Sequence, residues 1–166
     1  MAETLTQFFQ SLGLSNEAVI FIISMLPVVE LRGGIIMAAL LGMKWYVAVP
    51  LCILGNLLPI PFVLKFIRRF LDFLKKSKFL KRIIEWFENR TQNKGKNIQN
   101  GWLAGLILFV GIPLPGTGAW TGSLAADLFH IDFKKSMLAV VLGVLIAAAI
   151  VTVICYGFPA IASKVF

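Results

Sequence analysis

The feature that most restricts the possible folds is a pair of apolar runs that are each too short to cross a membrane. Residues 18–29 are apolar apart from Ser24 but only 12 residues long, which is roughly 18 Å as a helix. Pro27 and the stretch Glu30–Gly34 interrupt this run with a carboxylate, a guanidinium and two glycines, and residues 35–43 are apolar again. Two half-length arms around a polar bend predict a re-entrant hairpin, because irregular backbone at membrane depth is tolerated when buried in protein or facing a wet cavity.

The composition indicates a membrane protein. The chain is 58% hydrophobic and 14% charged, whereas soluble domains are roughly 45–50% apolar and about 25% charged. The net charge of +8 is concentrated, because 11 of the 16 Lys and Arg lie between Lys65 and Lys96. Such a cluster is typical of a cytoplasmic loop or of a surface that meets anionic lipid, so we do not expect nucleic acid as a partner.

The second half of the chain repeats the order of features in the first. Residues 45–65 are long enough to span, at about 31 Å, and residues 137–158 form an uninterrupted apolar run. Before the second run, residues 102–129 again read as a short arm, a Pro/Gly-rich bend and a short arm. The turns and spanning helices align at an offset of 88, which places Gly55 on Gly143, and the bends align at 85 or 86.

We therefore predict an all-α integral membrane protein built as an inverted repeat of two units, each a re-entrant helical hairpin plus a spanning helix. If the basic region is cytoplasmic, the hairpins enter from opposite sides and their tips can meet near the midplane, as in many secondary transporters. Four complete spans, with 18–43 and 102–129 crossing fully, remain the alternative, because charge counting barely separates the two topologies. Amphipathic interfacial helices are expected at 3–12 and 66–88.

The expected organisation is a single membrane domain, 1–166, with 1–65 as the first repeat, 66–101 as a basic cytoplasmic helix and linker, and 102–166 as the second repeat. We expect a multi-pass protein of a bacterial-type inner (plasma) membrane. Small residues at 38–39, 42 and 147–149 permit close helix packing within or between subunits, so a homo-oligomer is left open.

Glu30 and Arg32 are the first candidates for a functional role, because ionisable groups in membrane segments usually mark a site. They form either a buried ion pair that closes the bend or a substrate site. In the second case Arg32 would bind a phosphate or carboxylate. Glu30 would couple protons, since low dielectric disfavours the charged carboxylate. Gly33 and Gly34 lead into the second arm, where backbone N–H groups could face an anion.

The second bend offers backbone shape and donors instead of charge. It is either a simple break that needs glycine for unusual dihedral angles, or a binding loop with hydroxyl donors, helix-start N–H groups and an apolar wall. Asn56, within the first span, could line the same cavity or bond a carbonyl freed by a kink. The candidate residues of the second bend are Pro113, Pro115, Gly116, Thr117, Gly118, Trp120 and Thr121.

The sequence has no Ser–His–Asp set, Cys–His pair or metal-ligand cluster, so we expect neither an enzyme nor a cofactor. Cys52 and Cys155 lie in apolar runs and are expected as buried free thiols. The expected partners are membrane lipids and an amphipathic or anionic substrate.

Two stretches carry a family resemblance that covers nearly the whole chain. Residues 30–38, ELRGGIIMA, resemble the E-L-R-G-[GA]-I-P-x-A signature of the small multidrug export protein family, with Ile36 where that family usually has proline. Residues 113–122, PLPGTGAWTG, are similar to its second signature. The family is distantly similar to the DedA superfamily, whose members have two opposed re-entrant hairpins with functional acids and arginines.

The resemblance implies a membrane transporter in which Glu30 and Arg32 carry function. Some DedA members flip polyprenyl-phosphate carriers, so the leading hypothesis is proton-linked transport of a polyprenyl phosphate or a related lipid phosphate. The alternatives are a small multidrug/proton exporter of the same architecture and a non-transporting membrane scaffold whose working part is the helix at 66–88.

Overall fold

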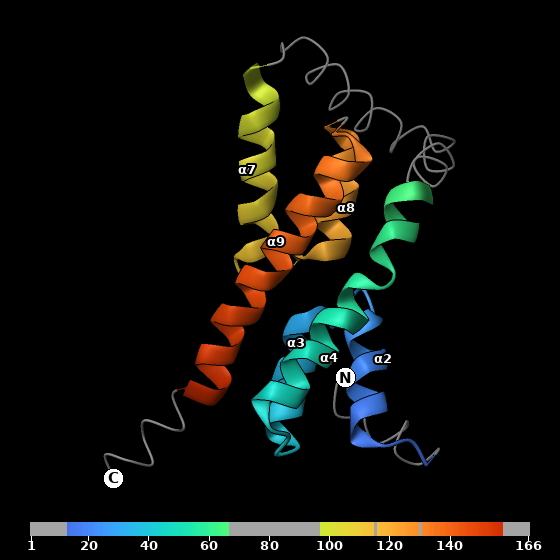
Figure 1. Cartoon of the computed structure of the whole chain (residues 1–166), viewed down its shortest axis with the longest axis vertical. Coiled ribbons are helices and arrows are strands. Elements are labelled where there is room, and N and C mark those ends of the chain that lie inside the picture. The colour runs from blue at the N-terminus through green and yellow to red at the C-terminus, as the bar shows by residue number, and fades with distance from the viewer. Residues whose placement is uncertain (1–12, 67–96, 115, 130, 158–166) are drawn as a thin grey trace.

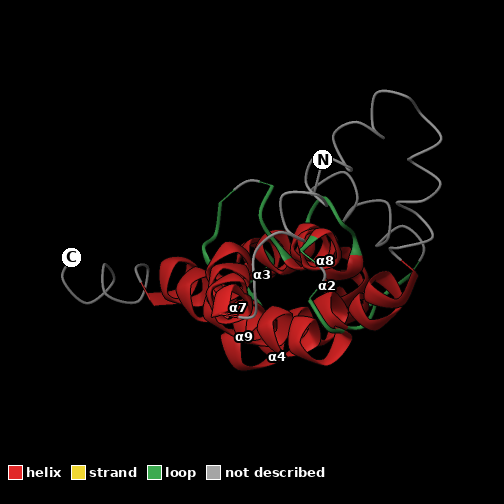
Figure 2. Cartoon of the chain, turned by 90° about the horizontal axis from the view of Figure 1, so that it is seen from above, coloured by secondary structure: helices red, strands yellow, loops and turns green. Residues whose placement is uncertain are grey.

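The computed structural model describes residues 13–66 and 97–157, apart from 115 and 130, as helices joined by short loops (Figure 1, Figure 2). The described elements contain no strand, which confirms the all-α class. The amphipathic helices predicted at 3–12 and 66–88 lie outside the described residues, except for their boundary at 66. The helices are α2 (Asn16–Met25), α3 (Glu30–Leu40), α4 (Trp45–Leu57), α7 (Asn97–Gly111), α8 (Ala119–Leu128) and α9 (Phe133–Thr152), followed by the π-helix η1 (Val153–Gly157).

Two helices are long and apolar enough to cross a membrane, Trp45–Phe66 with 22 residues and Phe133–Gly157 with 25. The first is interrupted by a turn at 58–59, between α4 and the helical residues 60–66. Pro59 and Pro61 explain the interruption, because neither has an N–H group to continue the helical hydrogen bonds. Both predicted spans therefore fall on helices that are long and apolar enough to cross a membrane, and the first of them is irregular.

The first helix pair, α2 and α3, differs from the prediction in where the chain bends. Leu26 has extended backbone (φ −74°, ψ 135°), as expected for a residue before proline, and this ends α2. The N–H of Glu30 donates to the Leu26 carbonyl at 2.9 Å, and the N–H of Gly33 to the Val29 carbonyl at 3.0 Å. The bend therefore lies at residues 26–29, and the polar stretch predicted as the bend is the first part of α3.

The second helix pair, α7 and α8, is joined by residues 112–118 and packs against α9. In the first half, α2 and α3 pack against α4 in the same way, and α3 and α4 also contact α9. Figure 1 shows α2 and α3 in the lower part of the molecule and α7 and α8 in the upper part, with the two bends facing each other between them. The two helix-to-helix loops therefore lie between the two helix pairs.

Glycines at equal spacing allow close helix contacts in both halves. A Cβ on Gly55 would clash with the Phe21 carbonyl and approach Ser24, and one on Gly143 would lie against the Ile107 carbonyl and Val110. These glycines are 88 residues apart and their partners 86 apart. The same holds for two further glycines and their partners, Gly34 against Ser24 and Gly122 against Val110.

Candidate functional site

The two bends are joined by Arg32, which extends from α3 to the end of α7. Its Nη2 donates to the carbonyls of Val110 and Ile112, both at 3.0 Å. Its Nη1 donates to the carbonyls of Leu114, at 2.6 Å, and Thr117. Both terminal nitrogens of the guanidinium therefore donate twice, and all four acceptors are backbone oxygens of the other helix pair.

This position suits a cation, because the last carbonyls of a helix have no intrahelical partner and carry the negative end of the helix dipole. In an apolar environment such carbonyls are costly to leave unpaired. A hydrogen bond to a charged group contributes about 1.5–3 kcal/mol. Arg32 is thus a cap for α7 supplied by a segment about 80 residues earlier in the chain.

Glu30 makes the complementary contact at the start of α8. Its Oε1 accepts a hydrogen bond from the Trp120 N–H at 3.2 Å, and the Ala119 N–H also bonds the carboxylate. A carboxylate at a helix N-terminus is favourable for the same reasons that favour a cation at the C-terminus. Glu30 is 8% exposed, and its φ of +51° lies in the left-handed region. Such backbone costs of order 1–3 kcal/mol in a non-glycine residue and is frequent at functional sites.

Gly118 makes this contact possible. A Cβ at position 118 would occupy the space of the Glu30 carboxylate, clashing with its carbon and both oxygens. The glycine is therefore required by the close approach of Glu30, since its own backbone is extended (φ 166°).

Trp120 completes an exchange of contacts between the bends. Its indole Nε1 donates to the Met25 carbonyl at 3.2 Å, at the end of α2. Arg32 therefore caps the first arm of the second pair, while Trp120 caps the first arm of the first pair. These two residues are 88 positions apart, and so are Glu30 and Gly118, which are in contact.

A cavity of about 620 Å³ lies between the bends. Glu30 and Arg32 line it together with the hydroxyl-bearing residues Thr117 and Thr121, and the remaining walls are mostly apolar. Those other lining residues are Pro27, Val28, Val29, Gly33, Pro113, Leu114 and Gly116.

The remaining predicted site residues lie in different surroundings. Gly34 packs against Ser24 and Cys52, and the Gly33 N–H is used within α3, so that predicted anion donor is already engaged. Asn56 is 1% exposed in α4, and its Oδ1 accepts no hydrogen bond from the described residues. Pro115 lies outside the described residues.

Sequence reasoning missed the backbone partners of Arg32 and Trp120. A signal for the first was present, because Arg32 is the only Lys or Arg before Lys44, and a helix that ends at membrane depth needs donors for its carbonyls. No sequence signal identifies the Met25 carbonyl as the partner of Trp120.

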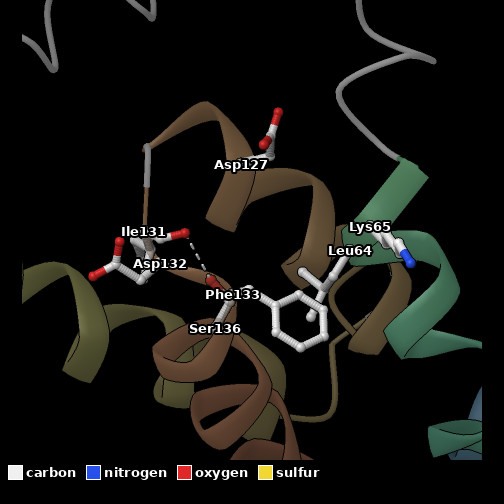
Figure 3. Close-up of a pocket in the computed structure, with 7 residues that line it drawn as sticks. All are labelled: Leu64, Lys65, Asp127, Ile131, Asp132, Phe133 and Ser136. Atoms are coloured by element: carbon white, nitrogen blue, oxygen red, sulfur yellow. Dashed lines mark hydrogen bonds between the residues drawn. The ribbon is translucent and has the colours of Figure 1, made fainter.

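A second cavity of about 630 Å³ lies where α8 meets α9, lined by Leu64, Lys65, Asp127, Ile131, Asp132, Phe133 and Ser136 (Figure 3). In Figure 3 the carboxylates of Asp127 and Asp132 point in different directions, and the Lys65 ammonium points away from both. Asp132 also pairs with Lys135 at 3.7 Å. The charged groups of this cavity do not converge, unlike those at the bends. The described residues contain no group of three or more His, Cys, Asp or Glu that could hold a metal ion.

Comparison with known proteins gives one match. No curated protein and no solved structure matches the chain significantly. The model of the family described as "Putative small multi-drug export protein" matches residues 30–150, well over half of the chain. The match begins at Glu30 and includes α3, the second bend and most of α9. The chain therefore belongs to the small multi-drug export protein family.

Proposed function

We propose that the protein is a proton-linked secondary transporter that moves an amphipathic substrate through the cavity between the bends. The observation that carries this proposal is the joining of Glu30 and Arg32 to the open helix ends of the opposite pair, beside a cavity of about 620 Å³. Ionisable groups at such depth are expensive and mark transport pathways in membrane proteins. The family's description as an export protein points to the same class of function.

The proposal includes an inverted repeat with two re-entrant hairpins, α2–α3 and α7–α8. It is supported by the facing bends, by the glycine contacts that recur at a spacing of 88, and by the exchange of caps between Arg32 and Trp120. In this arrangement the basic segment 66–101 is cytoplasmic, the membrane is the inner (plasma) membrane, and the two bends lie near the midplane. Broken helices that meet at the midplane are a common transporter architecture.

Glu30 is the proposed coupling group. As a carboxylate it holds the first N–H groups of α8, and this holds the two bends together. A protonated carboxyl is a weaker acceptor and has lost the charge that the helix dipole favours. Proton uptake would therefore loosen the contact between the bends, and proton release would restore it.

If the substrate is a lipid phosphate, Arg32 must have N–H donors available for the headgroup. Because both terminal nitrogens already donate to carbonyls, a phosphate headgroup would have to displace some of these bonds. A drug-like amphiphile needs no such displacement, so export of amphiphiles is the form that the geometry favours.

The test is transport by purified protein in proteoliposomes. A dodecyl-chain amphiphile is added under an imposed pH gradient, and proton movement is followed with an entrapped pH dye. Glu30→Gln is expected to abolish substrate-driven proton movement, because it removes the titrating group with little change in shape. Glu17→Gln, the same change at an exposed carboxylate in the first turn of α2, is the matched control and should transport normally.

Full transport by correctly folded Glu30→Gln would contradict the coupling role. A scaffold would instead show no transport by the unaltered protein, and neutralising the lysines at 66–88 would then impair its function more than changes at the bends.

A further inference from the structure

The side chains that line the cavity between the bends have few hydrogen-bond donors left. Arg32 would be the obvious donor for a substrate, but Nη1 and Nη2 each donate to two backbone carbonyls. These carbonyls belong to the open end of α7 and to the second bend, and at the membrane depth of the proposed function unpaired oxygens there would be costly. In this conformation the Nη1 and Nη2 groups of Arg32 therefore donate to backbone carbonyls and not to a ligand.

The two threonines of the cavity have also used their hydroxyl hydrogens. The Thr117 Oγ1 lies 2.9 Å from the carbonyl oxygens of both Ile112 and Leu114, and they share its one hydrogen. The Thr121 Oγ1 donates to the Gly118 carbonyl at 3.3 Å. A hydroxyl has one hydrogen and two lone pairs, so each threonine still offers an acceptor and no donor. The hydroxyl of Thr121 belongs to an exposed residue of the cavity wall.

Glu30 adds acceptor capacity on the same wall. A carboxylate has acceptor sites for about four hydrogen bonds, and the N–H groups of Ala119 and Trp120 use part of them. Glu30 and the two threonines thus present acceptors to a ligand, while the threonine hydroxyl hydrogens and four of the five guanidinium N–H groups are engaged.

The rest of the wall suits an apolar tail. Pro27 and Pro113 have no backbone N–H, and Val28 and Leu114 are 78% and 56% exposed beside them. A ligand that matches both parts carries hydrogen-bond donors on a compact head and a hydrocarbon chain behind it. An ammonium group has three donors and no acceptor.

We propose that the cavity between the bends binds an amphipathic primary ammonium ion, with its N–H groups on the acceptors of Glu30, Thr117 and Thr121 and its tail along Val28 and Leu114. This inference rests on the proposed function and names the substrate class of the same site. An alkyl phosphate has only acceptors when it is fully ionised, so it would meet the acceptor oxygens of Glu30, Thr117 and Thr121. To bind Arg32, it would have to displace the carbonyls at the end of α7.

The experiment compares three amphiphiles with the same chain: dodecylammonium, dodecyltrimethylammonium and dodecyl phosphate. Binding to the full chain in nanodiscs of zwitterionic lipid is measured by equilibrium dialysis, with empty nanodiscs as background. Dodecylammonium is expected to bind roughly tenfold or more tightly than dodecyltrimethylammonium, because the latter has the charge but no N–H donor. Equal binding of these two, or tighter binding of dodecyl phosphate, would overturn the inference.

A substitution in the cavity wall tests whether the preference for dodecylammonium arises in this cavity. Thr121→Val removes the acceptor with little change in volume and should weaken dodecylammonium binding by roughly tenfold, while dodecyltrimethylammonium binding stays constant. Thr152→Val, in the last turn of α9 and away from the lining residues, is the matched control and should change neither. Equal loss for both ligands in Thr121→Val would contradict the donor–acceptor account.

Transport separates this inference from the proposed function. If dodecyl phosphate is carried in a Glu30-dependent manner and dodecylammonium is not, the proposed function stands and the ammonium inference is wrong. If none of the three is carried, the proposed function itself fails.

Discussion

The contact between Glu30 and Gly118 makes Gly118→Ala the most informative single substitution. The added methyl would lie in the space of the Glu30 carboxylate, so either the carboxylate or the start of α8 must move. Displacing the carboxylate loses its hydrogen bond to the Trp120 N–H, which contributes about 1.5–3 kcal/mol for a charged acceptor. Overpacking costs typically about 1–3 kcal/mol more. Together these terms predict a decrease of about 2.5–6 kcal/mol in the free energy of unfolding.

The assay is equilibrium unfolding by SDS in mixed micelles, followed by far-UV circular dichroism. Gly105→Ala is the control, because a Cβ there meets nothing within 4 Å in the middle of α7, and alanine should stabilise that helix by about 0.5–1 kcal/mol. In a Glu30→Ala background the clash disappears, so Gly118→Ala should cost less than about 1 kcal/mol there. A full cost in both backgrounds would refute the carboxylate as the cause.

Two further predictions concern the relation between the halves. Gly55→Ala and Gly143→Ala should each destabilise the protein by about 1–3 kcal/mol in the same assay, because the new Cβ would clash with the Phe21 carbonyl in the first case and with the Val110 side chain in the second; a neutral result at either would contradict the close packing. Lys44→Cys and Lys135→Cys, both at exposed positions and made without the native cysteines, should react with a membrane-impermeant maleimide from opposite sides of intact cells; labelling from the same side would support four complete spans.

Within the described residues, the sequence predicted the apolar helices but placed the first bend too late and began the arm before the second bend at 102, whereas α7 begins at Asn97. Apolar run lengths and proline positions predicted both spans and both interrupted pairs, because these features follow from local geometry and desolvation. The predicted boundary of the second arm is wrong at Glu30–Gly34: charges and glycines are typical of loops, but this stretch begins α3. The residue before Pro27 ends α2 earlier, and a new helix can then begin at Glu30.

The roles of the site residues were harder to predict than their identity. Glu30 and Arg32 stood out because charge is rare in this part of the chain, and both line the cavity. The particular partner atoms were not predicted, since they are backbone atoms about 80 to 90 residues away, and the sequence signal at Arg32 indicates only that some helix end near it needs a donor. The hypothesis that Arg32 binds a phosphate did not consider that the carbonyls at the end of α7 accept hydrogen bonds from the same guanidinium.

Each of the two charged residues contacts the helix end whose partial charge is opposite to its own. Arg32 contacts the C-terminal end of α7, which carries partial negative charge, and Glu30 contacts the N-terminal end of α8, which carries partial positive charge. Exchanging the two residues would place like charges against both ends. Under the proposed function, the contacts that stabilise the bends weaken when a substrate or a proton reaches Glu30, so stability and transport would depend on the same hydrogen bonds. Such a transporter works only if the contact between Glu30 and the start of α8 is strong enough to stabilise the fold and weak enough to break during transport.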